Sequence, residues 1–251
     1  MSSVERTGWG VAISGHQFDL EDVAKMFPGS TAPSAQWHTH NNQRMLVLTA
    51  PELTTLGSSG EVRKASRDLL QEVNGLLACR EGSGHIALDC VVEFKSDGSL
   101  RRHIFADIKE GLSIRTRFSA TATLTRDGDT QVEERVEPAE TPTARHLRIA
   151  RANPALHSAI KHLADAKNLR DLYVVHEALS KAAEQACGEK REALKRIGWI
   201  STSDQQRFKQ SANVTRHSEY GAAPHASPMD FHEAKRVVAK AIGRAVEYFD
   251  Q

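Results

Sequence analysis

Short runs of strand-forming residues, separated by polar turns, dominate the first part of the chain. The runs 9–14, 36–40 and 44–49 are rich in aromatic, aliphatic and β-branched residues and predict three strands. The segment 41–43 (Asn-Asn-Gln) separates the second run from the third and predicts a hairpin turn, because asparagine tolerates the backbone of such turns.

Two helices are predicted beside these strands. Residues 20–27 have a short amphipathic pattern that follows Asp19, a residue type favoured at the N-cap, and the pair 28–29 (Pro-Gly) ends it. Residues 60–79 have apolar side chains at spacings of three and four, which predict a longer helix with one apolar face.

Three further runs, 85–94, 101–108 and 112–125, also have strand-like composition. The turn residues 96–99 (Ser-Asp-Gly-Ser) separate the first two runs. In the third run, apolar residues alternate with polar and charged ones, which is typical of a strand buried on one face. The front half therefore predicts a small sheet accompanied by two helices.

The clearest change in composition falls at residues 126–143, where charged residues and two prolines replace nearly all apolar ones. We interpret 127–143 as a linker between an α+β domain at 1–126 and a helical domain at 144–251. The predicted fold class is therefore α+β, with a small mixed or antiparallel sheet domain followed by an all-α bundle of four to five helices.

Beyond this linker the apolar periodicity is helical. It predicts helices over 156–163 and 169–183, the second ended by Gly188, and further helices over 190–197 and 203–217. Apolar stripes on neighbouring helices can bury one another, which favours a bundle.

The last helix has the best local start signal of the sequence. Ser227 is predicted as its N-cap, Pro228 as its first residue and Asp230 as the acid of a capping box. Its apolar stripe runs from Phe231 to Tyr248.

Charge, cysteine spacing and missing motifs argue against several classes of function. The 33 Lys and Arg residues balance 32 Asp and Glu residues to a net charge of +1, so there is no global attraction to nucleic acid or anionic lipid. Three cysteines without paired spacing indicate reduced thiols. No leader and no membrane-spanning run are found, so we expect a cytoplasmic protein without membrane association. Motifs for nucleotide, hydrolase and zinc-protease chemistry are absent, and we expect no cofactor.

A polar cluster between two predicted helices holds the strongest candidates for chemistry. Arg207, Asn213, Arg216, His217 and His225 gather there. Planar arginine donors suit phosphate, and a neutral histidine beside phosphate can transfer protons, so Arg216, His217 and His225 are candidate catalytic residues. Arginine and histidine also favour the C-terminal end of a helix for electrostatic reasons, and this structural interpretation stays open.

Two smaller patterns complete the candidates. Arg236, Lys240 and Arg244 recur every four residues and form a basic stripe on the last helix, either a solvated face or a binding surface for a nucleic-acid backbone. His38 and His40 lie on the same face of a predicted strand and could supply two ligands of a metal site, which would need at least one more.

The back half resembles a helical module found in many uncharacterised bacterial proteins. The resembling blocks are LYVVHEAL (172–179), GWIS (198–201), FKQSAN (208–213), RH (216–217) and PMDFHEA (228–234). They are scattered over about 100 residues, and the resemblance implies a helical bundle without an assigned activity.

More loosely, this bundle is similar to HEPN domains, whose active members cleave RNA with an R-x4–6-H motif. Arg170 and His176 are the pair with this spacing. Six residues of α-helix correspond to about 600°, so the two side chains should point roughly 120° apart. The resemblance therefore implies a non-catalytic member or one with altered chemistry.

Two functional hypotheses follow. The first is a non-enzymatic binding or scaffolding protein, with a protein partner or self-association, in a bacterial stress or defence assembly. The second is a metal-independent ribonuclease acting through Arg216 with His217 or His225, which makes nucleic acid the alternative partner. The front half resembles no family that would decide between them.

Overall fold

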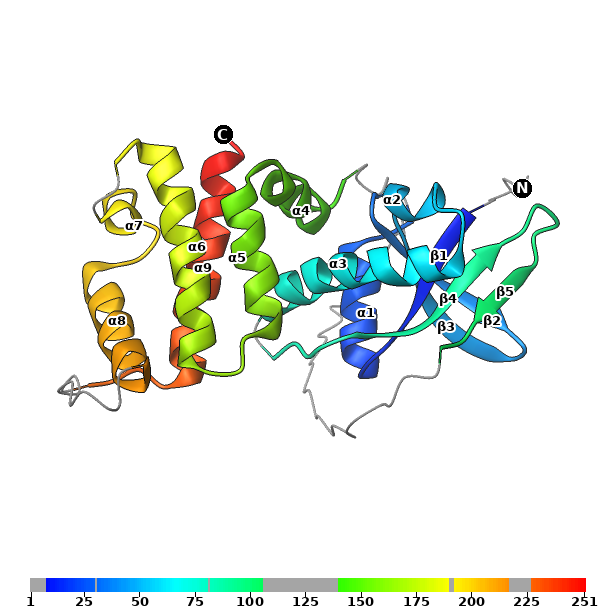
Figure 1. Ribbon diagram of the computed structural model, residues 1–251, viewed down its shortest axis with the longest axis horizontal. Helices are drawn as coiled ribbons and strands as arrows, with labels where there is room; N and C mark the ends of the chain where they lie inside the picture. The colour runs from blue at the N-terminus through cyan, green and yellow to red at the C-terminus, as the bar shows by residue number, and fades with distance from the viewer. Residues whose placement is uncertain (1–7, 30, 81, 106–139, 190–191, 217–226) are drawn as a thin grey trace, which may run out of the picture.

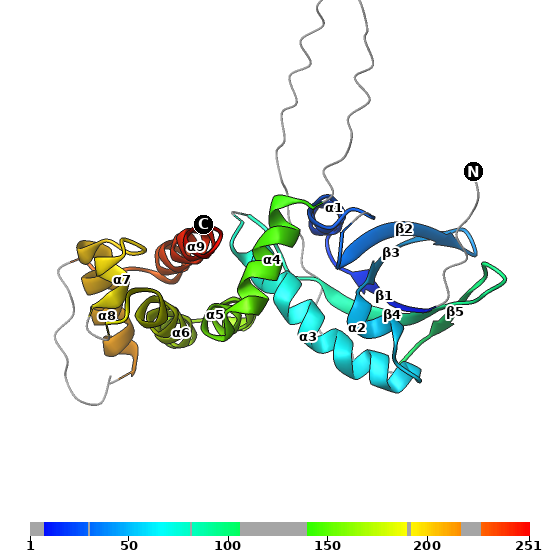
Figure 2. The same cartoon turned by 90° about the horizontal axis from the view of Figure 1, so that it is seen from above.

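The computed structural model of the chain describes residues 8–29, 31–80, 82–105, 140–189, 192–216 and 227–251. The sheet lies at one end of the molecule, and most of the helices gather at the other end (Figure 1). Helix α3 (Ser59–Ala78) runs beneath the sheet and reaches the helical end, as the view from above shows (Figure 2).

Five strands form one antiparallel sheet in the order β2-β3-β1-β4-β5. The strands are β1 (Gly8–Ser14), β2 (Ser34–His40), β3 (Gln43–Thr49), β4 (Ala87–Phe94) and β5 (Leu100–His103). Strand β1 lies at the centre because it pairs with both β3 and β4. The described chain confirms the predicted α+β class, with this sheet ahead of a helical half.

The predicted strands agree with the structure except at their ends. Asn41 and Asn42 make the β2–β3 turn with positive φ angles of 49° and 60°, as a two-residue hairpin loop of asparagines requires. The strand predicted over 101–108 is too long, since β5 ends at His103 and the next two residues are irregular. The strand predicted over 112–125 lies outside the described residues.

Helix α1 (Gln17–Met26) begins earlier than predicted because His16, and not Asp19, is its N-cap. The Nδ1 atom of His16 accepts a hydrogen bond from the Phe18 N–H at 3.4 Å. Asp19 is instead buried, and its carboxylate accepts a hydrogen bond of 2.6 Å from the Gly84 N–H. The acid therefore joins α1 to the loop before β4.

In the described part of the helical half there are five longer helices and the single turn α7. These elements are α4 (Pro142–Ala152), α5 (Pro154–Asp165), α6 (Leu169–Cys187), α7 (Ala193–Arg196), α8 (Thr202–Arg216) and α9 (Phe231–Phe249). The short α2 (Pro51–Thr54) precedes α3 in the sheet half.

Helix α4 was not predicted, because its first residues fall inside the expected linker 127–143. Thr141 caps this helix, since its Oγ1 accepts a hydrogen bond of 3.1 Å from the Ala144 N–H. The same hydroxyl donates to the Met26 carbonyl at 2.6 Å, so α4 begins against the end of α1. The linker up to residue 139 lies outside the described residues.

Two predicted helix starts are wrong by a few residues. Asp230 is the N-cap of α9 and accepts a hydrogen bond of 2.7 Å from the Glu233 N–H, so Ser227 and Pro228 lie outside the helix. Ser201, and not Ser203, accepts the N–H of Asp204 at the start of α8. In both cases several residues of capping type stand close together, and packing selects one.

Helix α3 connects the two halves through a close crossing with α5. A Cβ atom added to Gly75 would overlap the backbone carbonyl of Ile160, so glycine is required where the helices meet. Val73 and Leu77 of α3 belong to the same buried apolar cluster as Ile160 and Leu163 of α5. The core thus continues from the sheet into the helices, and the division into separate domains stays a prediction.

Candidate functional site

Buried polar contacts fix the angle between the two halves and therefore shape the space between them. Glu72 of α3 is buried, and its Oε1 lies 2.6 Å from Nε2 of His157 on α5. Burial alone would raise the pKa of this carboxyl, but hydrogen bonds from His157 and Arg151 outweigh burial and hold the pKa below its usual value. Glu72 is therefore a charged group that joins α3 to α4 and α5.

The loop between α3 and β4 is fixed from both sides. Asn74 lies within α3, and its side chain donates to the Ile86 carbonyl at 2.9 Å and accepts from the Ile86 N–H at 2.8 Å. Asp19 holds the Gly84 N–H of the same loop from α1. The loop that follows Cys79 is thus held in place opposite α9.

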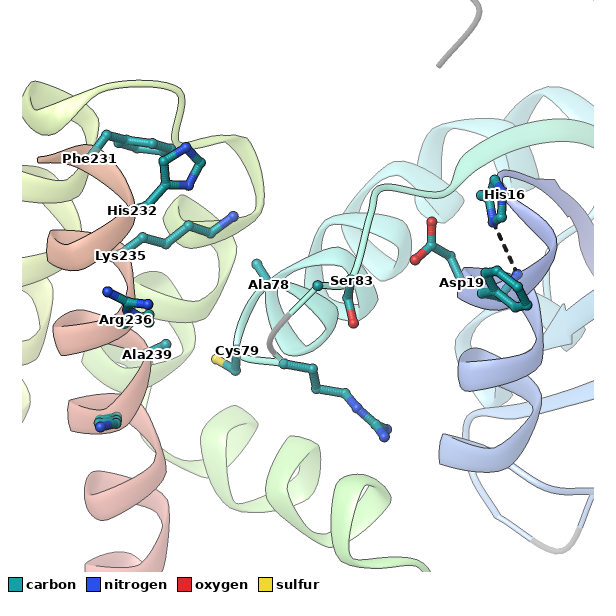
Figure 3. A pocket seen from close by; sticks show the side chains of 14 residues that line it. His16, Asp19, Ala78, Cys79, Ser83, Phe231, His232, Lys235, Arg236 and Ala239 are labelled. Carbon is teal, nitrogen blue, oxygen red and sulfur yellow. Dashed lines mark hydrogen bonds between the residues drawn. The ribbon is translucent and has the colours of Figure 1, made fainter. Parts of the chain in front are cut away.

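A cleft of about 910 Å³ opens between this loop, the start of α1 and the exposed side of α9. Figure 3 shows Lys235 reaching from α9 toward the loop, with His16 and Asp19 on the opposite side. Cys79, at the end of α3, and Ala239 of α9 lie close to each other in this view. The cleft therefore takes residues from both the sheet half and the helical half.

The cleft carries more positive than negative charge. Lys235, Arg236 and Lys240 line it from α9, and Arg80 lines it from the α3–β4 loop. Its described lining includes one acid, Asp19, which is buried and already accepts the Gly84 N–H. Cations on two facing walls strengthen the local potential, which favours an anionic group between them.

Aromatic rings lie on both walls of the cleft. The ring centroids of His16 and Phe18 on α1 are 5.0 Å apart, and those of Phe231 and His232 on α9 are 5.6 Å apart. Small side chains, including Ala78 of α3, line the space between the walls. The cleft thus offers apolar contacts in addition to its charges.

The Cys79 thiol also lines the cleft, but its environment keeps it protonated. Burial raises its pKa to about 12, although nearby Lys235 acts in the opposite direction. A thiol with so high a pKa is a poor nucleophile at neutral pH. Cys79 therefore contributes a small apolar surface to the cleft.

A second hollow of about 510 Å³ lies on the other side of the basic stripe. Arg236 and Lys240 line both hollows and are exposed. Arg244 lines only the second hollow, and its Nη1 donates to the carbonyls of Gly198 and Trp199 at 3.0 and 3.1 Å. The predicted stripe is therefore divided between exposed residues that line both hollows and a contact that supports the α7–α8 connection.

The predicted polar cluster is only partly described. Arg207 forms a bidentate ion pair with Glu233 of α9, at 2.7 and 3.1 Å, and its Nε donates to the Ser227 carbonyl at 3.1 Å. This arginine therefore has a structural role, because its contacts join α8 to α9. Asn213 and Arg216 belong to the last turn of α8, where the side chains are not described.

His217 and His225 lie outside the described residues, so the proposed catalytic pairing of Arg216 with either histidine stays a prediction. The two residues with the spacing of the HEPN motif, Arg170 and His176, lie among the described residues. Arg170 is exposed on α6, whereas His176 is buried and its ring stacks on Tyr173 and Phe208. These two side chains do not share a site.

The histidine pair of the predicted metal site lies on the edge strand β2. His38 packs its ring against Phe94, with centroids 5.4 Å apart, and His40 ends the strand. Across the described ranges, no group of three or more His, Cys, Asp or Glu side chains is arranged to hold a metal ion. A third ligand for His38 and His40 is thus missing from the described chain.

Several lining residues were not predicted. Lys235 stands next to the predicted Arg236, so the Lys-Arg pair was a signal that could have been used. Arg80 and Asp19 carry no such signal, because only the packing of α1 and α3 brings them opposite α9. No helix among the described residues is long and apolar enough to cross a membrane.

Comparison of the chain with protein-family models, curated proteins and solved structures found no match in any of the three. The functional argument therefore rests on the geometry and charge of the cleft.

Proposed function

We propose that the protein is a cytoplasmic, non-enzymatic binding protein that holds an anionic ligand in the cleft between its sheet half and its helical half. The observation that carries this proposal is that Arg80 of the α3–β4 loop lines the same cleft as Lys235, Arg236 and Lys240 of α9. Arg236 and Lys240 are four residues apart on α9, which separates them by about 6 Å along the helix axis.

The described polar groups of the cleft support binding more than catalysis. Asp19 and His16 both accept backbone hydrogen bonds, from Gly84 and Phe18 respectively. The Cys79 thiol is protonated at neutral pH. Binding of an anion needs only the cations and an accessible surface, and both are found here.

The ribonuclease alternative receives no specific support from the described residues. Arg207, the described side chain of that cluster, is paired with Glu233. Arg170 and His176 do not share a site. Catalysis through Arg216 with His217 or His225 stays a prediction.

The proposal can be tested with a labelled heparin oligosaccharide as a generic anionic probe. Fluorescence anisotropy should detect binding to the wild-type protein that weakens as salt rises from about 0.05 to about 0.3 M, because salt screens exposed charges. The double variant Arg80→Glu/Lys240→Glu changes one exposed cation on each wall and should weaken binding by about tenfold or more, which corresponds to about 1.4 kcal/mol.

The matched control is Arg170→Glu/Lys181→Glu, which makes the same charge change at exposed positions of α6 outside the cleft. It should bind the probe almost as well as the wild-type protein. Equal losses in the two double variants would mean that net charge, and not the cleft, determines binding, and the proposal would fall.

A further inference from the structure

We infer that the natural ligand of this cleft is a short, extended polypeptide segment in which acidic side chains are mixed with large apolar ones. This inference rests on the proposed anion-binding function and goes further by naming the class of ligand. Three features of the described cleft carry it: the placement of its cations, the placement of its rings, and the small side chains between them.

The cations occupy facing walls. Arg80 belongs to the α3–β4 loop, whereas Lys235, Arg236 and Lys240 belong to α9. A ligand that uses both walls must project negative groups in opposite directions. Successive side chains of an extended peptide do so, because they alternate between two sides of the backbone. Clusters of basic side chains are a common means of recognising acidic motifs.

The rings follow the same two-sided arrangement. Phe18, beside His16, lies on the α1 wall, and Phe231, beside His232, lies on the α9 wall. Both phenylalanines are partly exposed, so each wall offers an apolar contact as well as a cation. A peptide with acidic and apolar side chains can satisfy both kinds of contact on both sides.

The space between the walls suits a peptide backbone. Ala78, Cys79 and Ala239 are half-buried and present short side chains to the cleft. Side chains this short leave room for a peptide main chain.

Nucleic acid fits these features less well. A single strand bears its charge on one continuous backbone, whereas the cations here are divided between opposite walls. The second hollow, into which a strand following α9 would continue, is lined by Asp204 and Glu233 as well as by cations of α9, and Glu233 is paired with Arg207. An oligonucleotide is therefore included in the test as the competing ligand.

The test uses fluorescein-labelled peptides of about ten residues that alternate Glu or Asp with Leu or Phe. Two matched peptides replace either all acids by Gln and Asn or all apolar residues by Ser, and a uridine oligonucleotide of similar length is the fourth probe. We expect the alternating peptide to bind best, and each matched peptide to bind about tenfold more weakly or worse, a loss of about 1.4 kcal/mol.

The site is tested with Arg80→Glu/Lys240→Glu and with Ala239→Trp, which fills the space between the walls without changing charge. Both variants should lose binding of the alternating peptide by about tenfold, whereas Arg170→Glu/Lys181→Glu should not. Circular dichroism melting shows whether each variant is folded. If Ala239→Trp is unfolded, the smaller change Ala239→Leu takes its place and should show the same direction.

The outcomes separate the inference from the proposed function. Tighter binding of the oligonucleotide than of the alternating peptide, or undiminished binding of the serine peptide, would overturn the inference and leave an anion-binding cleft. Failure of every anionic probe, heparin included, would remove the proposed function as well. Loss of binding in both matched peptides and in both cleft variants would support the inference.

Discussion

The partly exposed Arg151 of α4 and the buried Glu72 of α3 form an ion pair that joins the helical half to the sheet half. Arg151 Nη2 lies 2.5 Å from Glu72 Oε2, and its Nε is 3.2 Å from both carboxylate oxygens. Nη2 also donates to Glu52 of α2 at 2.7 Å. One guanidinium thereby contacts acids from two helices of the sheet half, and this pairing helps to fix the orientation of the cleft walls.

Removal of one partner of this pair should be strongly destabilising. Glu72→Ala removes the acceptor that Arg151 and His157 share, and although Arg151 keeps Glu52, the loss of hydrogen bonds to a charged group costs about 1.5–3 kcal/mol. Urea denaturation followed by circular dichroism measures the change in unfolding free energy. The control is Glu140→Ala, which removes the exposed pair with Arg148 of α4 and should change stability little. Similar losses in both variants would contradict the role given to Glu72.

Two glycine-to-alanine substitutions should have opposite effects on stability, because only one of the glycines lies at the close crossing of α3 and α5. Gly75→Ala drives a methyl group into the backbone of Ile160, so the helices must separate, and we expect destabilisation by about 2 kcal/mol or more. Gly243→Ala places a methyl group in open space within α9 and should stabilise the protein by about 0.5–1 kcal/mol. Thermal melting of both variants measures these changes, and a neutral Gly75→Ala would show that the helices can move apart freely.

His176 should make the protein less stable in acid. Burial, with a smaller effect of nearby Lys209, lowers its pKa to about 4, and its Nε2 has no hydrogen-bond partner among the described residues. Between the ordinary value of 6.5 and about 4 the unfolded chain binds a proton that the folded protein does not, so stability falls as pH falls through this window. The loss attributable to this group is on the order of 3 kcal/mol.

The comparison of wild type with His176→Phe isolates that effect, because phenylalanine keeps the stacking on Tyr173 and Phe208 but does not titrate. Denaturation at pH values between about 7 and about 4 should show a shallower decline for the variant. Parallel curves for the two proteins would mean that other groups determine the acid sensitivity.

Loss of the Asn74 side chain should loosen the loop that forms one wall of the cleft. Asn74→Ala removes both hydrogen bonds to Ile86 and leaves a buried backbone donor and acceptor unpaired, at a cost of about 1–3 kcal/mol. Hydrogen exchange should accelerate at the Ile86 amide. Protection at Val47, which lies in the sheet away from the loop, should change only as far as global stability does.

Local pattern was enough to predict most elements. Alternation and turn residues identified β1 to β4, and the paired asparagines gave the β2–β3 turn because positive φ is a local property. Helix starts were predicted less well, since Ser201, Ser203, Ser227 and Asp230 are all capable caps. Helix α4 was missed because its first residues share the polar composition of the segment before it.

The candidate site was predicted only on one side. Arg236 and Lys240 were candidates because their spacing on α9 is visible in the sequence. Arg80 and Asp19 are 61 residues apart in the chain, and no periodicity relates them to each other or to α9. Arg207, which was a candidate, is used in an ion pair with Glu233 that depends on how α8 packs against α9.

The sequence by itself determined most of the helices and strands, because hydrophobic periodicity and turn chemistry act over a few residues. Tertiary structure decided which charged side chains are used in packing and which face an open cleft. The reason is that burial, ion pairing and the close passage of α3 over α5 at Gly75 depend on segments distant in the chain. The cleft exists because those long-range contacts hold the two halves at one angle.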